Sequence, residues 1–138
     1  MKFSAQEEYG LRCLITIAVQ KAGSPLTIPE IALAEGLSQP YVGKLLSHLR
    51  KSGFIKSTRG QFGGYTLDRQ PSEILVSDIL ESLGGRLYDE SFCHRHTGLQ
   101  VVCSHSMKCM LMPLWTRLQT AVDQALIGIT LEDLIGKK

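Results

Sequence analysis

Apolar and polar residues along the first half of the chain predict three helices. Residues 5–20 are apolar around most of the helical circumference, which is typical of a helix buried on several sides. Residues 28–35 follow a capping box formed by Thr27 and Glu30, and Gly36 is a stop signal for this short helix. The next helix begins after Ser38 and ends at Gly53. Its apolar positions fall at i, i+3, i+4 and i+7, namely Val42, Leu45, Leu46 and Leu49. The second and third helices together indicate a helix-turn-helix.

Two strand-like runs follow at residues 54–58 (FIKST) and 65–69 (YTLDR). The six residues between them include three glycines, which permit the positive φ angles of a tight hairpin. A helix-turn-helix followed directly by a hairpin is the arrangement of a winged helix. The expected fold class is therefore mainly α with a small β-hairpin wing.

The second half of the chain contains one long amphipathic helix. Residues 77–83 predict a short helix, and residues 85–109 show little pattern of either kind. A short helix at residues 131–135 follows Thr130 and Asp133, which resemble a cap. The long helix, residues 110–127, lies outside the winged helix, so its stripe is most easily buried against the first helix and a second copy of the chain. We therefore expect a homodimer. The stripe consists of Leu111, Leu114, Trp115, Leu118, Val122, Ala125 and Leu126.

Composition places the chain among soluble globular proteins. Its 138 residues, 43 % of them hydrophobic, suit one compact domain or a small domain with an accessory element. The start is acidic where a secretory signal is basic, and no run approaches the roughly 20 apolar residues of a membrane span. We expect a cytoplasmic protein with no membrane partner. In that reducing compartment the four cysteines are thiols, metal ligands or redox switches rather than a disulfide framework.

Positive charge is concentrated in the third predicted helix and the hairpin. The net charge of +2 is too small to indicate a nucleic-acid partner by itself. Residues 38–69, however, contain six basic residues and one acidic residue, Asp68. Phosphate neutralisation supplies most of the non-specific affinity for DNA, so this excess favours a DNA-binding surface over a merely solvated face. The basic residues are Lys44, Arg50, Lys51, Lys56, Arg59 and Arg69.

Particular side chains of this region are candidates for DNA contacts. The N-terminus of a recognition helix in the major groove places its first residues near base edges. Arg59 lies beside glycines at the hairpin tip, where it can enter a minor groove. Not every residue of this helix is expected to read DNA. We expect His48 to be an ordinary surface residue, and Tyr41 can serve mainly in packing. The helix candidates are Ser38, Gln39, Tyr41, Lys44 and the basic Arg50.

The stretch CHRHTGLQVVCSHSMKC, residues 93–109 and called the cysteine segment below, contains three cysteines and three histidines. The intervals between Cys93, Cys103 and Cys109 are a poor match to the closely spaced pairs of zinc sites and to ferredoxin runs. Three thiolates on a loop can still hold an iron–sulfur cluster, with one ligand left to find. Reduced thiols and a zinc site completed by a histidine remain as alternatives. Cys13, within an apolar helix, is expected to be a core residue.

Several stretches together resemble the Rrf-type winged-helix transcription regulators. They are EEYGLRCL, LSQPYVGKLLSHLRKSGFIKSTRGQFGGYTL, the cysteine segment and PLWTRLQTAVDQALIGITLEDLI, which cover nearly the whole chain. The resemblance implies a homodimer that binds operator DNA, with contacts that include Arg59 and Gly60 of the hairpin. This chain has Gly43 in the DNA-reading helix where the family often has an acidic residue. We therefore expect its preferred operator sequence to differ from those of such members.

The same resemblance implies that Cys93, Cys103 and Cys109 bind a [2Fe–2S] or a [4Fe–4S] cluster. Some members complete the site with a histidine where this chain has Met112, and others with an acidic residue near the N-terminus of the partner subunit, a position matched by Glu8. We expect Glu8 as the fourth ligand and prefer [2Fe–2S], in which a non-thiolate ligand is common. The alternative ligands are His94, His96 and His105.

These expectations divide the chain into three parts. They are a winged helix-turn-helix DNA-binding domain (1–84), a cysteine-rich cluster-binding loop (85–109), and a dimerisation helix with a C-terminal helix (110–138). The expected function is a transcription regulator, not an enzyme and without a small-molecule substrate, whose operator binding responds to redox, nitric oxide or iron–sulfur status. Three rivals remain open: a cluster-free regulator that senses oxidants through its thiols, an enzyme using Cys93 with His94 or His96, and an iron–sulfur carrier or protein-binding winged helix.

Overall fold

The computed structural model describes residues 1–21, 23–105 and 108–136. Residues 106 and 107 of the cysteine segment are outside this part of the chain. The chain divides into two compact units, here called unit 1 (Met1–Gly84 with Gly128–Lys138) and unit 2 (Gly85–Ile127). None of the helices described is long and apolar enough to span a membrane.

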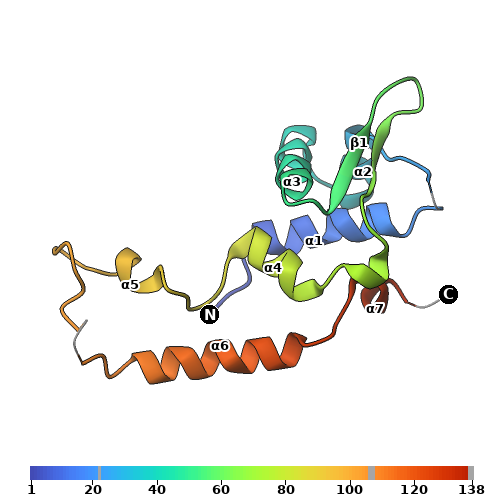
Figure 1. The fold of residues 1–138 in the computed structure, drawn as a ribbon. Helices are drawn as coiled ribbons and strands as arrows, with labels where there is room; N and C mark the ends of the chain where they lie inside the picture. The colour runs from blue at the N-terminus through green and yellow to red at the C-terminus, as the bar shows by residue number, and fades with distance from the viewer. Residues whose placement is uncertain (22, 106–107, 137–138) are drawn as a thin grey trace. The chain divides into compact units, whose positions relative to one another are not determined.

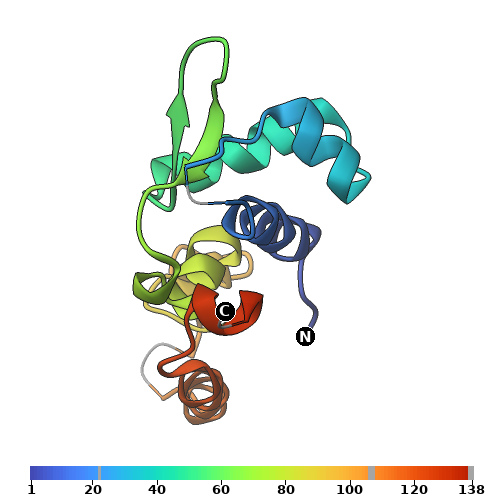
Figure 2. The same ribbon diagram turned by 90° about the vertical axis from the view of Figure 1, so that its right-hand side faces the viewer.

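Unit 1 is a winged helix built around its first helix, α1 (Ala5–Ala18). The helices α2 (Ile28–Glu35), α3 (Gln39–Lys51) and α4 (Val76–Gly84) all pack on α1 (Figures 1 and 2). This central position explains why α1 is apolar on several sides. The core that the four helices share includes Leu14, Ile17, Ile31, Val42, Leu45, Leu46, Leu49 and Ile79.

Local capping residues set the ends of the helix-turn-helix as predicted. Thr27 accepts a hydrogen bond from the backbone N–H of Glu30 at the start of α2, and Gly36 ends α2 in the left-handed conformation. One detail of the expected capping box differs. The Glu30 carboxylate accepts from the Thr27 hydroxyl at 2.9 Å, whereas a full capping box has it accept from the backbone N–H of the cap residue. Ser38 caps α3 through the backbone N–H of Tyr41.

The hairpin pairs β1 (Ile55–Thr58) with β2 (Gly64–Leu67) in antiparallel register, from Ile55 opposite Leu67 to Thr58 opposite Gly64. These strands and the loop 59–63 between them are called the wing below. Leu26 forms a bridge with Tyr65 through hydrogen bonds of 3.1 and 2.7 Å, which joins the wing to the segment before α2. A mainly helical fold with a hairpin wing is therefore confirmed.

The C-terminal helix α7 (Leu131–Ile135) belongs to unit 1 by its packing. Thr130 and Asp133 form the expected capping box. Leu131 is fully buried in the core of unit 1, and its backbone N–H donates to the carbonyl oxygen of Ile74 at 2.8 Å. The short 3-10 helix η1 (Pro71–Glu73), which the sequence pattern did not predict, lies against α7. Packing thus joins α7 to the winged helix rather than to the long helix that precedes it in sequence.

Unit 2 contains α5 (Phe92–Arg95) and the long helix α6 (Met112–Leu126). The single turn of α5 falls in the region where the sequence showed little pattern. Hydrogen bonds attach the beginning of the unit to α6, because the backbone N–H of Tyr88 donates to Gln119 at 3.0 Å and Arg86 pairs with Asp123 at 2.7 Å. The arginine, followed by Gln119, holds the pKa of Asp123 below its usual value.

Candidate nucleic-acid interface and cysteine segment

The N-terminal end of α3 presents polar side chains to solvent. Ser38, Gln39 and Lys44 are exposed, and the Ser38 hydroxyl also caps the helix by accepting from Tyr41 at 3.3 Å. A hydroxyl that accepts one hydrogen bond still has its own proton to donate. Ser38 therefore has a structural role that is compatible with a contact to a phosphate or a base.

Tyr41 combines packing with partial exposure. Its ring makes an edge-to-face contact with Tyr9 of α1, with 6.1 Å between the ring centroids, and the residue is half-buried. The packing role suggested by the sequence is thus present. At the other end of α3, Arg50 and Lys51 are exposed in the last turn, where positive charge also stabilises the helix C-terminus.

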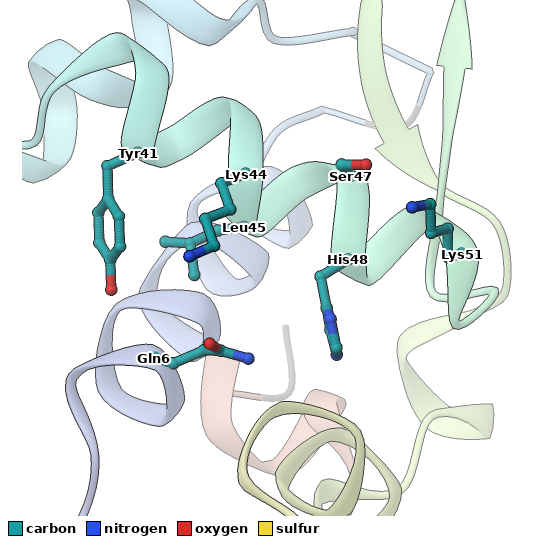
Figure 3. A pocket seen from close by; sticks show the side chains of 7 residues that line it. All are labelled: Gln6, Tyr41, Lys44, Leu45, Ser47, His48 and Lys51. Atoms are coloured by element: carbon teal, nitrogen blue, oxygen red, sulfur yellow. The ribbon is translucent and has the colours of Figure 1, made fainter.

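A cavity of about 270 Å³ lies alongside α3 (Figure 3). Lys44 and His48 extend from α3 and Gln6 approaches from α1. His48 is not an ordinary surface residue, because its Nε2 donates to the carbonyl oxygen of Ser82 at 2.5 Å and so connects α3 to α4. Sequence reasoning missed Gln6, whose amide donates to Leu83 far along the chain at 2.8 Å; no local signal indicates that contact. The lining residues are Gln6, Tyr41, Lys44, Leu45, Ser47, His48 and Lys51.

The wing presents a second basic surface. Lys56, Arg59 and Gly60 are all exposed, and Arg59 begins the loop between the strands. Arg69, just after β2, lies over the ring of Phe54 with its guanidinium carbon 5.2 Å from the ring centroid. That cation–π contact holds the base of the wing. The proposed DNA contacts on α3 and on the wing therefore belong to the same compact unit.

Three of the four cysteines are in unit 2 as free thiols. Cys93 is in α5 and exposed, while Cys103 and Cys109 are half-buried. The fourth, Cys13, is a core residue of unit 1 as expected, and burial, followed by the charge of Glu35, raises its pKa to about 11. The protein therefore has three accessible thiols and one protected thiol.

Cys93 and Cys109 both influence the pKa of one side chain, Tyr88. Burial, the charges of the two thiols and a hydrogen bond with Cys93 raise the pKa of Tyr88 above its usual value. The Cys109 sulfur also accepts a hydrogen bond from the backbone N–H of Met112, at 3.2 Å, where α6 begins. Two of the three predicted cysteine ligands thus affect the same phenol, and Cys93 also hydrogen-bonds with it. Cys103 does not take part in these contacts.

Aromatic packing positions the thiol of Cys93. Phe92 contacts Tyr88 and Trp115, with centroid distances of 5.3 and 6.1 Å, and stacks on the imidazole of His96 at 4.2 Å. Nδ1 of His96 donates to the backbone carbonyl oxygen of Phe92 at 2.7 Å. Since Cys93 follows Phe92 directly, this packing places its thiol close to Tyr88.

The donor chemistry of the cysteine segment fits an iron–sulfur cluster, since three thiolates on one loop are suitable ligands. Their arrangement is not that of an assembled site, because within the residues described no three His, Cys, Asp or Glu side chains gather closely enough to hold a metal ion. Among the same described residues, the other candidate ligands are not gathered with the three thiols in such a group either. Glu8 is on α1 and pairs with Arg12 at 2.8 Å, and His94 and His105 are exposed. Binding all three thiolates to one cluster therefore requires a different arrangement of the segment.

Comparison with known proteins identifies the family. Residues 3–137 match the Rrf2 family, described as an iron-dependent transcriptional regulator. The transcriptional regulator IscR of Aliivibrio salmonicida is 30 % identical over 98 % of this chain and 77 % of its own length. The regulator CymR of Bacillus subtilis is 34 % identical over 97 % of this chain and 89 % of its own length.

A solved structure supports the same conclusion. The structure of CymR, the global cysteine regulator of B. subtilis, superposes with a TM-score of 0.72 at 32 % identity, covering 98 % of this chain and 96 % of the other. Both curated relatives are transcriptional regulators and neither is named as an enzyme. The match extends through the winged helix and through the cysteine segment. The chain therefore belongs to the Rrf2 family of DNA-binding transcription regulators.

Proposed function

We propose that this chain works as a homodimer that binds operator DNA through α3 and the wing, and that its affinity for DNA depends on the state of three thiols in the cysteine segment. One observation carries the proposal. A winged-helix unit with a basic surface is joined in one chain to a unit in which Cys93, Cys103 and Cys109 are accessible thiols. A chemical change at the thiols can therefore be sensed in one unit and expressed as DNA binding by the other.

The homodimer rests on the apolar surface of α6. Leu111, Met112, Leu114 and Val122 are all exposed and belong to one helical region. A stripe of this kind on a long helix is most economically buried against the same stripe of a second copy. Dimerisation would also place two recognition helices at a fixed spacing, as two operator half-sites require.

An iron–sulfur cluster is our preferred form of the controlling state. Cys93, Cys103 and Cys109 would hold it, with Glu8 of the partner subunit as fourth ligand, and [2Fe–2S] is the preferred type. When bound, such a cluster supplies sensitivity to oxidants, nitric oxide or iron supply. The ligand role of Glu8 requires the carboxylate to leave its exposed ion pair with Arg12, which is worth little in water.

Residues of this chain would couple the state of the thiols to DNA binding. Binding three thiolates together would order the cysteine segment, which Phe92 and Trp115 already attach to the start of α6. Because α6 also carries the proposed dimer contacts, that order would restrict the spacing of the two α3 helices. A ligand shifts an equilibrium only by binding its two states differently, so the state of the thiols and the bound operator should each change the other's affinity.

A thiol switch without a cluster is the second candidate. It is favoured by the influence that Cys93 and Cys109 both have on the pKa of Tyr88, and by the likeness to CymR, which is described as the global cysteine regulator of B. subtilis. Oxidation of these two thiols by hydrogen peroxide would form one S–S bond and release two molecules of water, the peroxide being reduced. Cys103 would not be needed for this reaction.

Serine variants separate the two candidates. Wild type, Cys93→Ser, Cys103→Ser and the control Ser104→Ala are purified without oxygen and analysed for iron, sulfide and zinc. Affinity for a DNA duplex selected by the wild type is then measured before and after peroxide treatment. The cluster proposal predicts iron loss and changed affinity in both cysteine variants. The thiol switch predicts that Cys103→Ser still responds to peroxide while Cys93→Ser does not. Equal affinities in all variants and conditions would contradict both.

A further inference from the structure

The tip of the wing carries an exposed aromatic side chain. Phe62 is 83 % exposed and lies beyond the last paired residues of the hairpin, Thr58 and Gly64. Single exposed apolar residues are common on protein surfaces, so exposure alone does not indicate a function. The turn that presents Phe62 and the charges around it distinguish this residue from others.

The backbone of the turn is fixed by glycines. The N–H of Gly63 donates to the carbonyl oxygen of Gly60 at 3.0 Å, which makes Gln61 and Phe62 the two central residues of a four-residue turn. Gly60 has a φ of 114°, a conformation that favours glycine. A Cβ atom at Gly63 would overlap the carbonyl oxygen of Thr58. The sequence thus specifies a tight turn with Gln61 and Phe62 at its end, and in Figure 2 this loop extends away from the helices of unit 1.

The surroundings of Phe62 favour a polyanion as its partner. The segment from 55 to 69 contains Lys56, Arg59 and Arg69 against a single acidic residue, Asp68. Arg59 is exposed, is three residues from Phe62 in the same loop, and pairs with no carboxylate in the part of the chain described, so its charge is available to a ligand of the loop. An aromatic ring flanked by unpaired positive charge is suited to DNA, which offers phosphates beside apolar sugar and base surfaces.

We propose that Phe62 enters the minor groove of operator DNA as an apolar wedge, with Arg59 and Gln61 beside it. Proteins that bind this groove combine polar side chains such as arginine and glutamine with apolar side chains that partly unstack a base step. The inference rests on the proposed DNA binding through α3 and the wing. It adds Phe62 as a contact residue with a role different from that of Arg59. Arg59 supplies electrostatic attraction, whereas Phe62 opens the stack and excludes water.

A wedge of this kind makes the wing selective without hydrogen bonds to bases. Pyrimidine–purine steps such as TA and CA unstack more easily than others, so the energetic cost of the wedge depends on the step at its position. Phe62 should therefore favour operators with a flexible step opposite each wing. Replacement by alanine should remove that preference as well as part of the affinity.

The experiment uses short duplexes selected from a random-sequence pool by the wild-type protein, with 2-aminopurine placed in turn at the steps near the wing. Affinity, its salt dependence and 2-aminopurine fluorescence are measured for wild type, Phe62→Ala, Phe62→Leu and Arg59→Ala. Leu33→Ala, which truncates another apolar side chain that is 87 % exposed, is the matched control. Thermal unfolding of each variant verifies the fold, which an exposed residue should not affect.

We expect Phe62→Ala to weaken binding about tenfold for each wing, the order expected for loss of a buried aromatic contact, and so about 100-fold for the two wings of the proposed homodimer, with the salt slope unchanged. Phe62→Leu should keep most of the affinity, and the fluorescence increase caused by wild type should disappear in Phe62→Ala. An affinity for Phe62→Ala equal to that of Leu33→Ala, while Arg59→Ala binds weakly, would overturn the wedge and leave DNA binding intact. No fluorescence change with wild type at any step would also overturn it. Failure of the wild type to bind any duplex at low salt would instead contradict DNA binding itself.

Discussion

Replacing Arg59 by alanine should reduce the salt dependence of DNA binding by a predictable amount. Arg59 is exposed at the start of the wing loop and has no ion pair among the residues described, so its charge is free to neutralise a phosphate. Each phosphate contact on duplex DNA contributes about 0.9 to the slope of log affinity against log salt concentration. The proposed homodimer has two wings, so the variant should lose about 1.8 of that slope.

The consequence is large enough to measure. Between 50 and 200 mM salt, the wild type should lose about 12-fold more affinity than Arg59→Ala loses, since a fourfold change in salt is raised to the power of about 1.8. The assay is fluorescence anisotropy of a labelled duplex over this salt range. Arg117→Ala, which removes an exposed arginine from α6 in unit 2, is the control and should keep the wild-type slope. An unchanged slope in Arg59→Ala would refute the assignment of a phosphate contact to this residue.

Three further predictions concern stability, reactivity and assembly. Leu131→Ala should lower the free energy of unfolding by about 2–5 kcal/mol in urea titrations, because the Leu131 side chain is fully buried. Leu134→Ala on the same helix should lower it much less, since Leu134 is exposed. Equal losses in the two variants would contradict the packing of α7. Cys13, with a pKa of about 11, should be only about 0.1 % thiolate at pH 8 and alkylate about 100-fold more slowly than in urea, where its ordinary pKa of 9.0 applies. Its protonated form is favoured in the folded state, so its contribution to stability should decrease as the pH rises from 9 towards 11, because the unfolded chain releases the proton first; rapid native labelling detected by mass spectrometry would show the expectation to be wrong. Leu114→Glu, at an exposed position of α6, should shift the proposed homodimer towards monomer in light scattering. Thr120→Glu, on another face of the helix, is the control and should leave the oligomeric state unchanged. An unchanged oligomeric state in Leu114→Glu would exclude this stripe as the interface.

Local chemistry made much of unit 1 predictable. Ser38, Thr27 and Thr130 cap helices at the expected positions because a cap depends on residues only a few places apart. The hairpin is likewise specified by its strands and glycines. Periodicity of apolar residues located the faces of α3 and α6, since a helix repeats on a fixed period.

Contacts between distant residues could not be read in the same way. The hydrogen bond from His48 to Ser82 joins residues 34 positions apart, and that from Gln6 to Leu83 joins residues 77 apart. No spacing rule relates such pairs, so the lining of the cavity beside α3 was only partly predicted. The α5 turn was missed because it is short and its packing depends on Tyr88 and Trp115, which are outside it.

For the cysteine segment, too, the kind of chemistry could be predicted from the sequence, whereas the arrangement of its side chains could not. The shared role of Cys93, Cys103 and Cys109 as cluster ligands was predicted from the family resemblance, and it stays a prediction. The sequence did not predict that Cys93 and Cys109 both influence the pKa of Tyr88 while Cys103 does not. That difference is the reason that the Cys103 variant distinguishes a cluster from a disulfide between Cys93 and Cys109.

The most direct test of the central claim is the visible absorption spectrum of protein purified without oxygen, recorded with its iron and sulfide content and its affinity for a selected duplex before and after cluster removal. We predict a coloured protein with equal amounts of iron and sulfide, whose affinity for DNA changes when the colour is lost. A colourless protein that cannot be reconstituted with iron and sulfide, and whose DNA affinity does not respond to thiol oxidation, would contradict control of DNA binding by the cysteine segment.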